Sequence, residues 1–271
     1  MTKLDTMARF MEHYYEAEQL FNKDNIVGLF LQGSQNYGLD YEHSDVDTKL
    51  ILTPSLHDII INNPPVSTTY VRKNDEHIDL KDIRLYIQTF RKQNINFVEI
   101  LFTDYFVINP KYEQWWNLLV THREEIAHYN MFRAVKTMKG VAMEKYHAME
   151  HQYPSKAAVL AEFGYDPKQV SHLVRLSDFI TRYIAGERYE DCLTPKNADF
   201  VMDIKMGKYN LSEARKIAEE NIQYITKICD AFTAVTPDQC NPEVENLFNY
   251  VQYNIMKASL CTELGTQFKE D

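Results

Sequence analysis

The segment 26–52 constrains the fold of this chain more than any other. Two apolar runs, 26–31 and 50–52, enclose a Gly-Ser pair at 33–34 and an Asp-Val-Asp triplet at 45–47. Short apolar runs bounded by turn residues are typical of buried strands, and a Gly-Ser pair is typical of a tight turn. The segment therefore predicts two strands, with a glycine turn after the first and two carboxylates at the start of the second.

The direction of side chains along a strand makes the acidic triplet informative. Successive strand residues point to opposite faces, so Asp45 and Asp47 project together while Val46 points into the core. At about 4 Å and an effective dielectric constant near 20, two like charges repel by roughly 4 kcal/mol. A divalent cation removes this repulsion, and hard oxygen ligands suit magnesium better than zinc. We therefore predict a strand from about residue 45 to 52 that carries a Mg²⁺ site.

The turn between the strands supplies a different kind of group. Gly33 has no Cβ, so the backbone can turn sharply and lie close to a ligand. The Ser34 hydroxyl and the neighbouring amides can donate hydrogen bonds to phosphate oxygens. Gly33 and Ser34 are therefore the expected binding residues for a nucleotide triphosphate.

The spacing of these two motifs resembles a known signature. Gly33-Ser34, a gap of ten residues and then Asp45-Val46-Asp47 is similar to the signature of the DNA polymerase β-like nucleotidyltransferase superfamily. The resemblance implies a third carboxylate on a later strand. Asp79 is the candidate, because residues 77–81 alternate polar and apolar side chains as a half-buried strand does. Asp45, Asp47 and Asp79 are then the expected catalytic and metal-binding trio.

Two further segments resemble one branch of this superfamily, the bacterial and phage nucleotidyltransferases labelled as RNA-repair-pathway proteins. The segments are 164–176, with its Gly-Tyr-Asp-Pro-Lys and His-Leu-x-Arg-Leu sequences, and 94–101. In the second segment Ile95 stands where the branch has proline. The resemblance covers most of residues 26–190.

Lys168, His172 and Arg175 share one helical face, because they are spaced at i, i+4 and i+7. Pro167 suits the first turn of that helix and Asp166 suits its cap, so the face begins at the positive end of the helix dipole. Such a face suits phosphate, which favours nucleotide or acceptor binding. A structural role, in which these residues cap and bridge neighbouring helices, is the alternative.

Other polar residues lie near the predicted acidic site. Lys49 and Lys81 project with the aspartates in the strand pattern, and we expect each to pair with a carboxylate or with a triphosphate. His43 and His77 are expected to act as hydrogen-bonding partners rather than as catalysts. Glu99 is interpreted as an anchor for a basic residue.

Hydrophobic periodicity divides the chain into a mixed part and a helical part. An amphipathic helix is predicted at 3–22, and a hairpin over 66–81 completes the small mixed sheet that the superfamily implies. After about residue 108 the periodicity is helical, with helices expected at about 130–150, 167–185, 211–235 and 243–262. We therefore predict an α+β fold with a catalytic core at 1–108 and an α-helical domain at 109–271.

Composition and charge restrict the class of protein. The net charge of −10 opposes a broad surface for nucleic acid, because neutralising phosphates drives such binding. A basic pattern over 133–145 suits either a local groove or a solvated helix face. Four cysteines without paired spacing predict reduced thiols. With no leader sequence and no apolar run near about 18 residues, we expect a soluble, cytoplasmic protein that does not bind membranes.

The function that these features predict is Mg²⁺-dependent transfer of a nucleoside monophosphate from an NTP, with ATP as the first guess, to a hydroxyl acceptor. Asp45 and Asp47 are expected to hold one of two magnesium ions, and Asp79 to join them on the second or to accept a proton. An RNA end such as that of tRNA is the favoured acceptor. The alternatives are a nucleotide-binding regulatory protein of the antitoxin type, which acts on a protein partner, and a nucleotidyltransferase for small molecules such as antibiotics.

Overall fold

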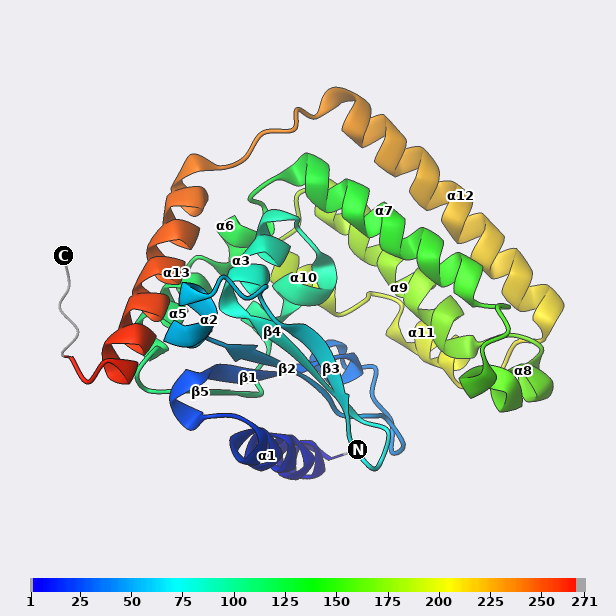
Figure 1. Ribbon diagram of the computed structural model, residues 1–271. Helices are drawn as coiled ribbons and strands as arrows, with labels where there is room; N and C mark the ends of the chain where they lie inside the picture. Colours follow the sequence, from blue (N-terminus) through cyan, green and yellow to red (C-terminus); the bar gives the residue numbers. More distant parts are fainter. Residues whose placement is uncertain (1, 267–271) are drawn as a thin grey trace. The chain divides into compact units, whose positions relative to one another are not determined.

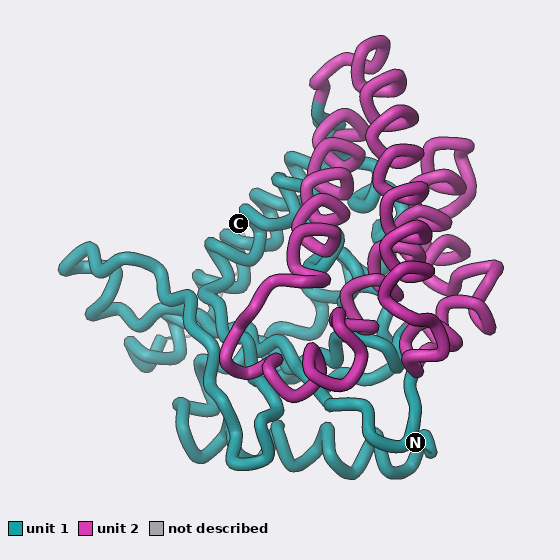
Figure 2. The backbone as a smooth tube through the Cα atoms, turned by 90° about the vertical axis from the view of Figure 1, so that its right-hand side faces the viewer, with its two compact units in different colours: residues 1–36, 40–129, 240–271 teal, residues 37–39, 130–239 magenta. Residues whose placement is uncertain are grey.

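The computed structural model describes residues 2–266. Its contacts divide the chain into two compact units (Figure 2), of which the first contains 1–36, 40–129 and 240–271 and the second contains 37–39 and 130–239. This division differs from the predicted one at residue 108. The reason is that the helices of 113–127 and 242–263 pack with the part of the chain that carries the sheet.

The first unit is built on a five-stranded sheet in the order β3-β4-β2-β1-β5 (Figure 1). β2 and β4 run parallel, and the other three neighbouring pairs are antiparallel, so the sheet is mixed. The fold is therefore α+β, as predicted, and the expected hairpin is the pair β3 and β4. The strands are β1 (Ile26–Gln32), β2 (Asp47–Leu52), β3 (Ser67–Val71), β4 (His77–Asp82) and β5 (Phe106–Ile108).

Two details of the sheet differ from the prediction. β2 begins at Asp47, so Asp45 lies in the preceding loop, where the Ser44 amide donates to the Tyr41 carbonyl at 3.0 Å. β5 was not predicted at all. Its three residues are too few to show a periodic pattern, and pairing with β1 is what makes them a strand.

One face of the sheet is apolar and is covered by α1 (Lys3–Leu20) (Figure 1). The helix starts with a capping box between Thr2 and Asp5, which satisfies two amides at its amino end. Phe10 is completely buried, which contributes roughly 1.5–3 kcal/mol. The residues that form this core cluster are Phe10, Ala17, Ile26, Leu29, Leu31, Val46, Leu50, Ile78 and Leu80.

The opposite face is covered by α3 (Ile83–Arg91) and α5 (Glu113–Thr121). Asp82 caps α3, because its carboxylate accepts a hydrogen bond from the Arg84 amide at 2.8 Å. Phe30, which alternates with the α1-facing residues of β1, packs on Trp116 with 4.5 Å between the ring centroids. The same face also carries charged residues of the strands, among them Lys49 of β2 and Asp79 of β4.

The helix α13 (Pro242–Glu263) completes the first unit, although it follows the second unit in the sequence. Glu245 accepts hydrogen bonds from Arg91 at 2.8 Å and from the Tyr129 hydroxyl at 2.7 Å. Phe248 stacks on Phe90, with 5.9 Å between the ring centroids. The remaining short elements of this unit are η1 (Lys23–Asn25), α2 (Leu56–Ile60), α4 (Ile95–Val98), η3 (Glu99–Phe102) and α6 (Arg123–Ala127).

The second unit is a helical bundle organised around α9 (Pro167–Ile184), which contacts α7, α10, α11 and α12. Asp166 caps α9 and Pro167 occupies its first turn, as predicted. The segment 37–39 belongs to this unit, and Lys205 donates to the Leu39 carbonyl at 2.6 Å. The other helices are α7 (Met131–Ala148), η4 (Pro154–Lys156), α8 (Ala157–Phe163), α10 (Tyr189–Leu193), α11 (Ala198–Lys205) and α12 (Leu211–Val235), and η2 (Ser34–Tyr37) leads into the segment 37–39.

Two further features concern the state of the cysteines and the apolar character of the helices. Cys192, Cys229, Cys240 and Cys261 are free thiols, as predicted. Among residues 2–266, none of the helices has the length and apolar character that crossing a membrane requires.

A buried carboxylate connects the parts of the first unit that lie near the predicted site. Glu76 is only 1% exposed and precedes β4. Its carboxylate accepts hydrogen bonds from α1, from the β3–β4 loop and from the backbone of the segment before β2. Its partners are Arg9, His13 at 3.0 Å, Arg72 at 2.7 Å, Asn74 at 2.6 Å and the Val46 amide at 3.0 Å.

The charge state of this group follows from its partners. Burial raises the pKa of Glu76, but the hydrogen bonds from His13, Asn74 and the Val46 amide outweigh burial and lower the pKa from 4.5 to about 2. Burial also lowers the pKa of His13, so its imidazole is neutral near pH 7. A neutral ring donates from one nitrogen only, so His13 donates to Glu76 and accepts from Thr48, which is 2.9 Å away.

We predict that Glu76→Gln lowers the free energy of unfolding by roughly 3 kcal/mol at pH 7, the value of a pKa depression from 4.5 to about 2. Because the folded pKa is depressed, the stabilisation is complete above pH 4.5 and is lost as the pH falls to about 2. Urea denaturation at a series of pH values measures this difference. Glu12→Gln, which removes an exposed partner of Arg72, is the control and should change little. An equal loss in both variants would contradict the assignment.

Candidate active site

The glycine turn lies directly beside the start of β2. Gln32, the last residue of β1, pairs with Asp47, the first residue of β2, and Gly33 follows Gln32. Gly33 has a φ of +108°, a conformation that other residues rarely adopt. Gly33 and Ser34 are both half-buried, so a ligand can reach them. The sequence prediction of a tight turn next to the acidic triplet is therefore confirmed.

Side chains outside the turn hold it in place. The Asn36 amide donates to the Gly33 carbonyl at 3.0 Å, and the Asn36 side chain donates to the Leu31 carbonyl at 3.1 Å. The Thr103 hydroxyl then donates to the Asn36 side-chain oxygen at 2.7 Å. The turn thus has a fixed backbone before any ligand binds, which reduces the entropy lost on binding.

Asp45 lies in the exposed loop before β2. Its carbonyl accepts a hydrogen bond from the Gln35 amide nitrogen at 2.7 Å. This contact fixes the orientation of the Gln35 amide, because the carbonyl needs a donor. The other end of that amide, the oxygen Oε1, is buried and has no hydrogen-bond partner among the described residues. An acceptor oxygen is therefore available beside the acidic loop.

Asp47 and Asp79 lie on the same face of neighbouring parallel strands. Lys49 pairs with Asp79 across β2 and β4, and Asp47 precedes Lys49 by two residues, so all three project together. From the strand rise and spacing, the Cα atoms of Asp47 and Asp79 are roughly 8 Å apart. Asp47 accepts hydrogen bonds on one oxygen from the His77 amide at 2.9 Å and the His77 ring at 3.2 Å. His77 is thus the hydrogen-bonding partner that the sequence predicted.

Asp79 forms ion pairs with the lysines of the same face. Its oxygens lie 3.0 Å from Lys49 Nζ and 3.6 Å from Lys81 Nζ. Both ammonium groups also face the ring of Phe97, at 3.9 and 5.1 Å from its centroid. The expected pairing of Lys49 and Lys81 with a carboxylate is therefore confirmed.

Lys49 is unusual because it is 3% exposed. Burial lowers the pKa of Lys49, and the charge of Asp79 opposes this change. Asp79 is the carboxylate that compensates the buried ammonium, so removing either partner leaves the other charge poorly compensated.

The carboxylate oxygens of this region suit magnesium, although they are not already grouped as a complete set of metal ligands. Within residues 2–266, no group of three His, Cys, Asp or Glu side chains is placed to hold a metal ion. Magnesium is usually bound by one or two carboxylates, with waters and substrate phosphates completing its shell. Asp45 and Asp47 are accessible oxygen donors of this kind, and the unpartnered Gln35 oxygen lies beside them. Asp79 as a metal ligand stays a prediction, because Lys49 already neutralises its charge.

The other predicted binding residues belong to the second unit. Lys168, His172 and Arg175 share one face of α9, and exposure decreases along it, from the exposed Lys168 through the half-buried His172 to Arg175, which is 3% exposed. The Arg175 guanidinium stacks on the Tyr37 ring, 3.8 Å from the centroid. Burial, together with the charges of Arg175 and Lys145, lowers the pKa of His172 well below its ordinary value. His172 is therefore neutral near pH 7.

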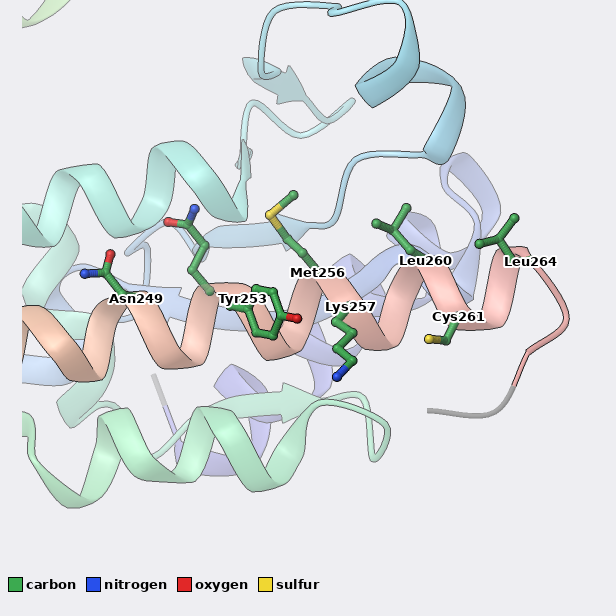
Figure 3. Close-up of a pocket in the computed structure, with 8 residues that line it drawn as sticks. Asn249, Tyr253, Met256, Lys257, Leu260, Cys261 and Leu264 are labelled. Carbon is green, nitrogen blue, oxygen red and sulfur yellow. The ribbon is translucent and has the colours of Figure 1, made fainter. Parts of the chain in front are cut away.

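A separate hollow of about 450 Å³ follows one side of α13 (Figure 3). Met256, Leu260 and Leu264 contribute apolar side chains to it, and the Lys257 ammonium lies 5.6 Å from the centroid of the Tyr253 ring. None of the predicted site residues lines this hollow, and its lining includes no carboxylate. It is therefore not a candidate for the catalytic site.

Comparison with known proteins adds little. No family model matches the chain, and no curated protein matches it. Among solved structures, the chain is similar to a nucleotidyltransferase-like protein from Exiguobacterium sibiricum 255-15, with 11% sequence identity and a TM-score of 0.29. The match covers 82% of this chain and 74% of the other. A TM-score this low supports no conclusion about function.

Sequence reasoning did not find two residues that organise the site, Glu76 and Gln35. Glu76 lies within the predicted hairpin of 66–81 but outside the alternating pattern of 77–81, so no pattern marks it as buried. Gln35 lies between polar neighbours, and only the structure shows that its amide contacts the Asp45 backbone.

We predict that Gly33→Ala destabilises the protein by about 1–3 kcal/mol, because alanine is strained at a φ of +108°. A new Cβ there would meet only Gln35 Oε1 at 3.6 Å, so the cost is conformational rather than steric. The matched control is Gly140→Ala within α7, where nothing lies within 4 Å and alanine favours helix. Urea denaturation of both variants should show opposite changes. A stable Gly33→Ala would contradict the strained turn.

Proposed function

We propose that this protein is a nucleotidyltransferase that moves a nucleoside monophosphate from an NTP to a hydroxyl acceptor and releases pyrophosphate. The main support is one observation. Asp47 and Asp79 lie on the same face of β2 and β4, at a sheet whose first strand ends in the Gly33 turn beside Asp47. A phosphate-binding turn next to grouped carboxylates suits transfer that relies on positioning and charge neutralisation.

Each residue has a role in the proposed reaction. The Gly33 turn and the Ser34 hydroxyl bind triphosphate oxygens. Asp45 and Asp47 would hold Mg²⁺, which when bound neutralises charge on the triphosphate, and the resemblance implies a second ion. The acceptor oxygen forms a bond to the α-phosphorus while the bond to the bridging oxygen of the β-phosphate breaks, so pyrophosphate leaves.

Asp79 is proposed to receive the proton of the acceptor hydroxyl. It lies on the same face as Asp47, and the Lys49 ammonium at 3.0 Å already neutralises its charge without a metal. Because Lys49 already compensates the charge of Asp79, we assign Asp79 the proton and not a second ion. Lys81, at 3.6 Å, keeps a positive charge beside the reacting groups.

We also propose which acceptor and which nucleotide the protein uses. An RNA end such as that of tRNA is the favoured acceptor because of the branch that the sequence resembles. The net charge of −10 is compatible with an acceptor that is held at its end rather than along a broad basic surface. ATP is the first nucleotide to test.

A nucleotide-binding regulatory protein is the second candidate. The observation that favours it is that no three metal-ligating side chains are gathered within residues 2–266. Such a protein would bind NTP without turning it over and would act through a protein partner. Calorimetry with NTP, followed by analysis for pyrophosphate, separates the two candidates.

We predict that Asp47→Asn lowers transfer of label from an α-labelled NTP by about 100-fold or more, the scale on which one group that stabilises transition-state charge contributes. The assay uses Mg²⁺ and pools of tRNA, other RNA, protein and small-molecule acceptors. Asp79→Asn should also lower transfer. If no pool accepts label from the unaltered protein, the proposal is wrong.

The matched control is Asp75→Asn. Asp75 lies in the exposed β3–β4 loop with a φ of +62°, a conformation that asparagine adopts readily. The same chemical change should therefore leave both folding and transfer unaltered. Equal loss in the Asp75 and Asp47 variants would show that the effect is not specific to the site.

A further inference from the structure

Arg175 carries a buried charge, and two of its three guanidinium nitrogens have no hydrogen-bond partner among the described residues. Its residue is 3% exposed, and its Nε and Nη1 atoms are buried without a hydrogen-bond partner among the described residues. The contact that the structure gives to the guanidinium is the Tyr37 ring at 3.8 Å. Stacking on an aromatic ring offsets only part of the cost of burying a cation, so the site as described is incomplete.

Arg182, on the same helix, is a buried arginine whose guanidinium has hydrogen-bond acceptors. Arg182 is 8% exposed and donates to Glu187 at 2.8 Å and to Asp178 at 3.2 Å. It also donates to two backbone carbonyls, those of Thr194 at 2.9 Å and Asp191 at 2.5 Å. Among the described residues, Arg182 thus has several acceptors, whereas Nε and Nη1 of Arg175 have none, although both arginines belong to α9.

Several cations act on His172, which lies one turn of α9 before Arg175. The charges that act on the His172 ring come from Arg175, Lys145, Lys168 and Lys205, which belong to α9, α7 and α11. Two of these lysines have known contacts, since Lys145 lies 3.0 Å from Glu144 and Lys205 donates to the Leu39 carbonyl. The carbonyl contact leaves the charge of Lys205 in place. The cations that act on His172 therefore come from three helices of the second unit.

We propose that the second unit binds an oligophosphate chain at the face of α9 formed by Lys168, His172 and Arg175. Arg175 donates to phosphate oxygens from Nε and Nη1, the two nitrogens without an acceptor among the described residues. The neutral His172 ring donates one hydrogen bond, and Lys168 and Lys205 contribute charge. All of the proposed contacts come from side chains of the second unit, so we expect this binding to need no divalent cation.

The arrangement favours an oligophosphate over a single small anion. Lys168 and Arg175 are seven residues apart on α9, which corresponds to about 10 Å along the helix axis. Several cations spread over this length match a chain of phosphates better than one carboxylate. Phosphate oxygens also suit a planar guanidinium, which donates in fixed directions. The phosphate chain could be inorganic or the triphosphate of a nucleotide, and the experiment distinguishes these sources.

The experiment measures binding of tripolyphosphate, ATP and orthophosphate to the full chain by calorimetry in EDTA. We expect tripolyphosphate to bind more tightly than orthophosphate. Arg175→Met should weaken tripolyphosphate binding by about 10- to 100-fold, as expected for the loss of charge-assisted hydrogen bonds. Arg215→Met removes an exposed arginine that pairs with Glu150 at 2.6 Å, and it should leave the affinity unchanged.

Thermal unfolding without ligand separates a binding role from a structural one. Replacing an uncompensated buried charge with an apolar side chain of similar size should raise the melting temperature, so Arg175→Met is expected to be more stable than the unaltered protein. Arg182→Met should be less stable, because it leaves Asp178 and Glu187 without their partner. A fall in the melting temperature of Arg175→Met would assign it a structural role and overturn the proposal.

Two further results decide the ligand. ATP binding as tight as that of tripolyphosphate supports recognition of the phosphate chain alone, and tighter ATP binding identifies a nucleotide as its source. If none of the three ligands binds in EDTA, or if Arg175→Met binds tripolyphosphate normally, the proposal is wrong. Asp47→Asn should retain this binding even where it loses transfer, so the outcome is independent of the proposed activity.

Discussion

The buried carboxylate of Glu76 is the interaction on which the sheet unit depends. A carboxylate that is 1% exposed is tolerated only because donors from separate segments converge on it. His13 comes from α1, Arg72 from the β3–β4 loop, and the Val46 amide from the segment that carries Asp45 and Asp47. The backbone between Asp45 and Asp47 is therefore held by the buried charge of Glu76, in addition to the contacts that the two aspartates make.

The pairing of β2 with β4 gives the sheet one face that packs against α1 and an opposite face that carries charged side chains. Leu50 and Leu80 pack against α1, whereas Lys49 and Asp79, one position away on the same strands, face the opposite side. The strand period of two makes this separation automatic once the register is fixed. A shift of one residue would bury the charged pair against Phe10, which is why the register is strongly determined.

Much of this arrangement was predictable from the sequence, because its signals are local. The apolar runs gave β1 and most of β2, the alternation over 77–81 gave β4, and three-and-four spacing gave the long helices. What could not be predicted depends on contacts between distant residues: the short β5, the start of β2 at Asp47, the burial of Glu76 and the grouping of α13 with the sheet. The strand pattern predicted that Lys49 pairs with a carboxylate or a triphosphate, but no local pattern shows that Nε and Nη1 of Arg175 have no acceptor among the described residues.

The place of α13 in the chain has a consequence for the order of folding. Residues 130–239 enter and leave the first unit at neighbouring points, since the Asn241 amide donates to the Tyr129 carbonyl at 2.9 Å. During synthesis the helical bundle is complete before Glu245 and Phe248 emerge to pack on Arg91 and Phe90. The strands of the first unit can therefore pack with α13 only after residues 130–239 have been made, and the bundle can fold before α13 is added to the first unit.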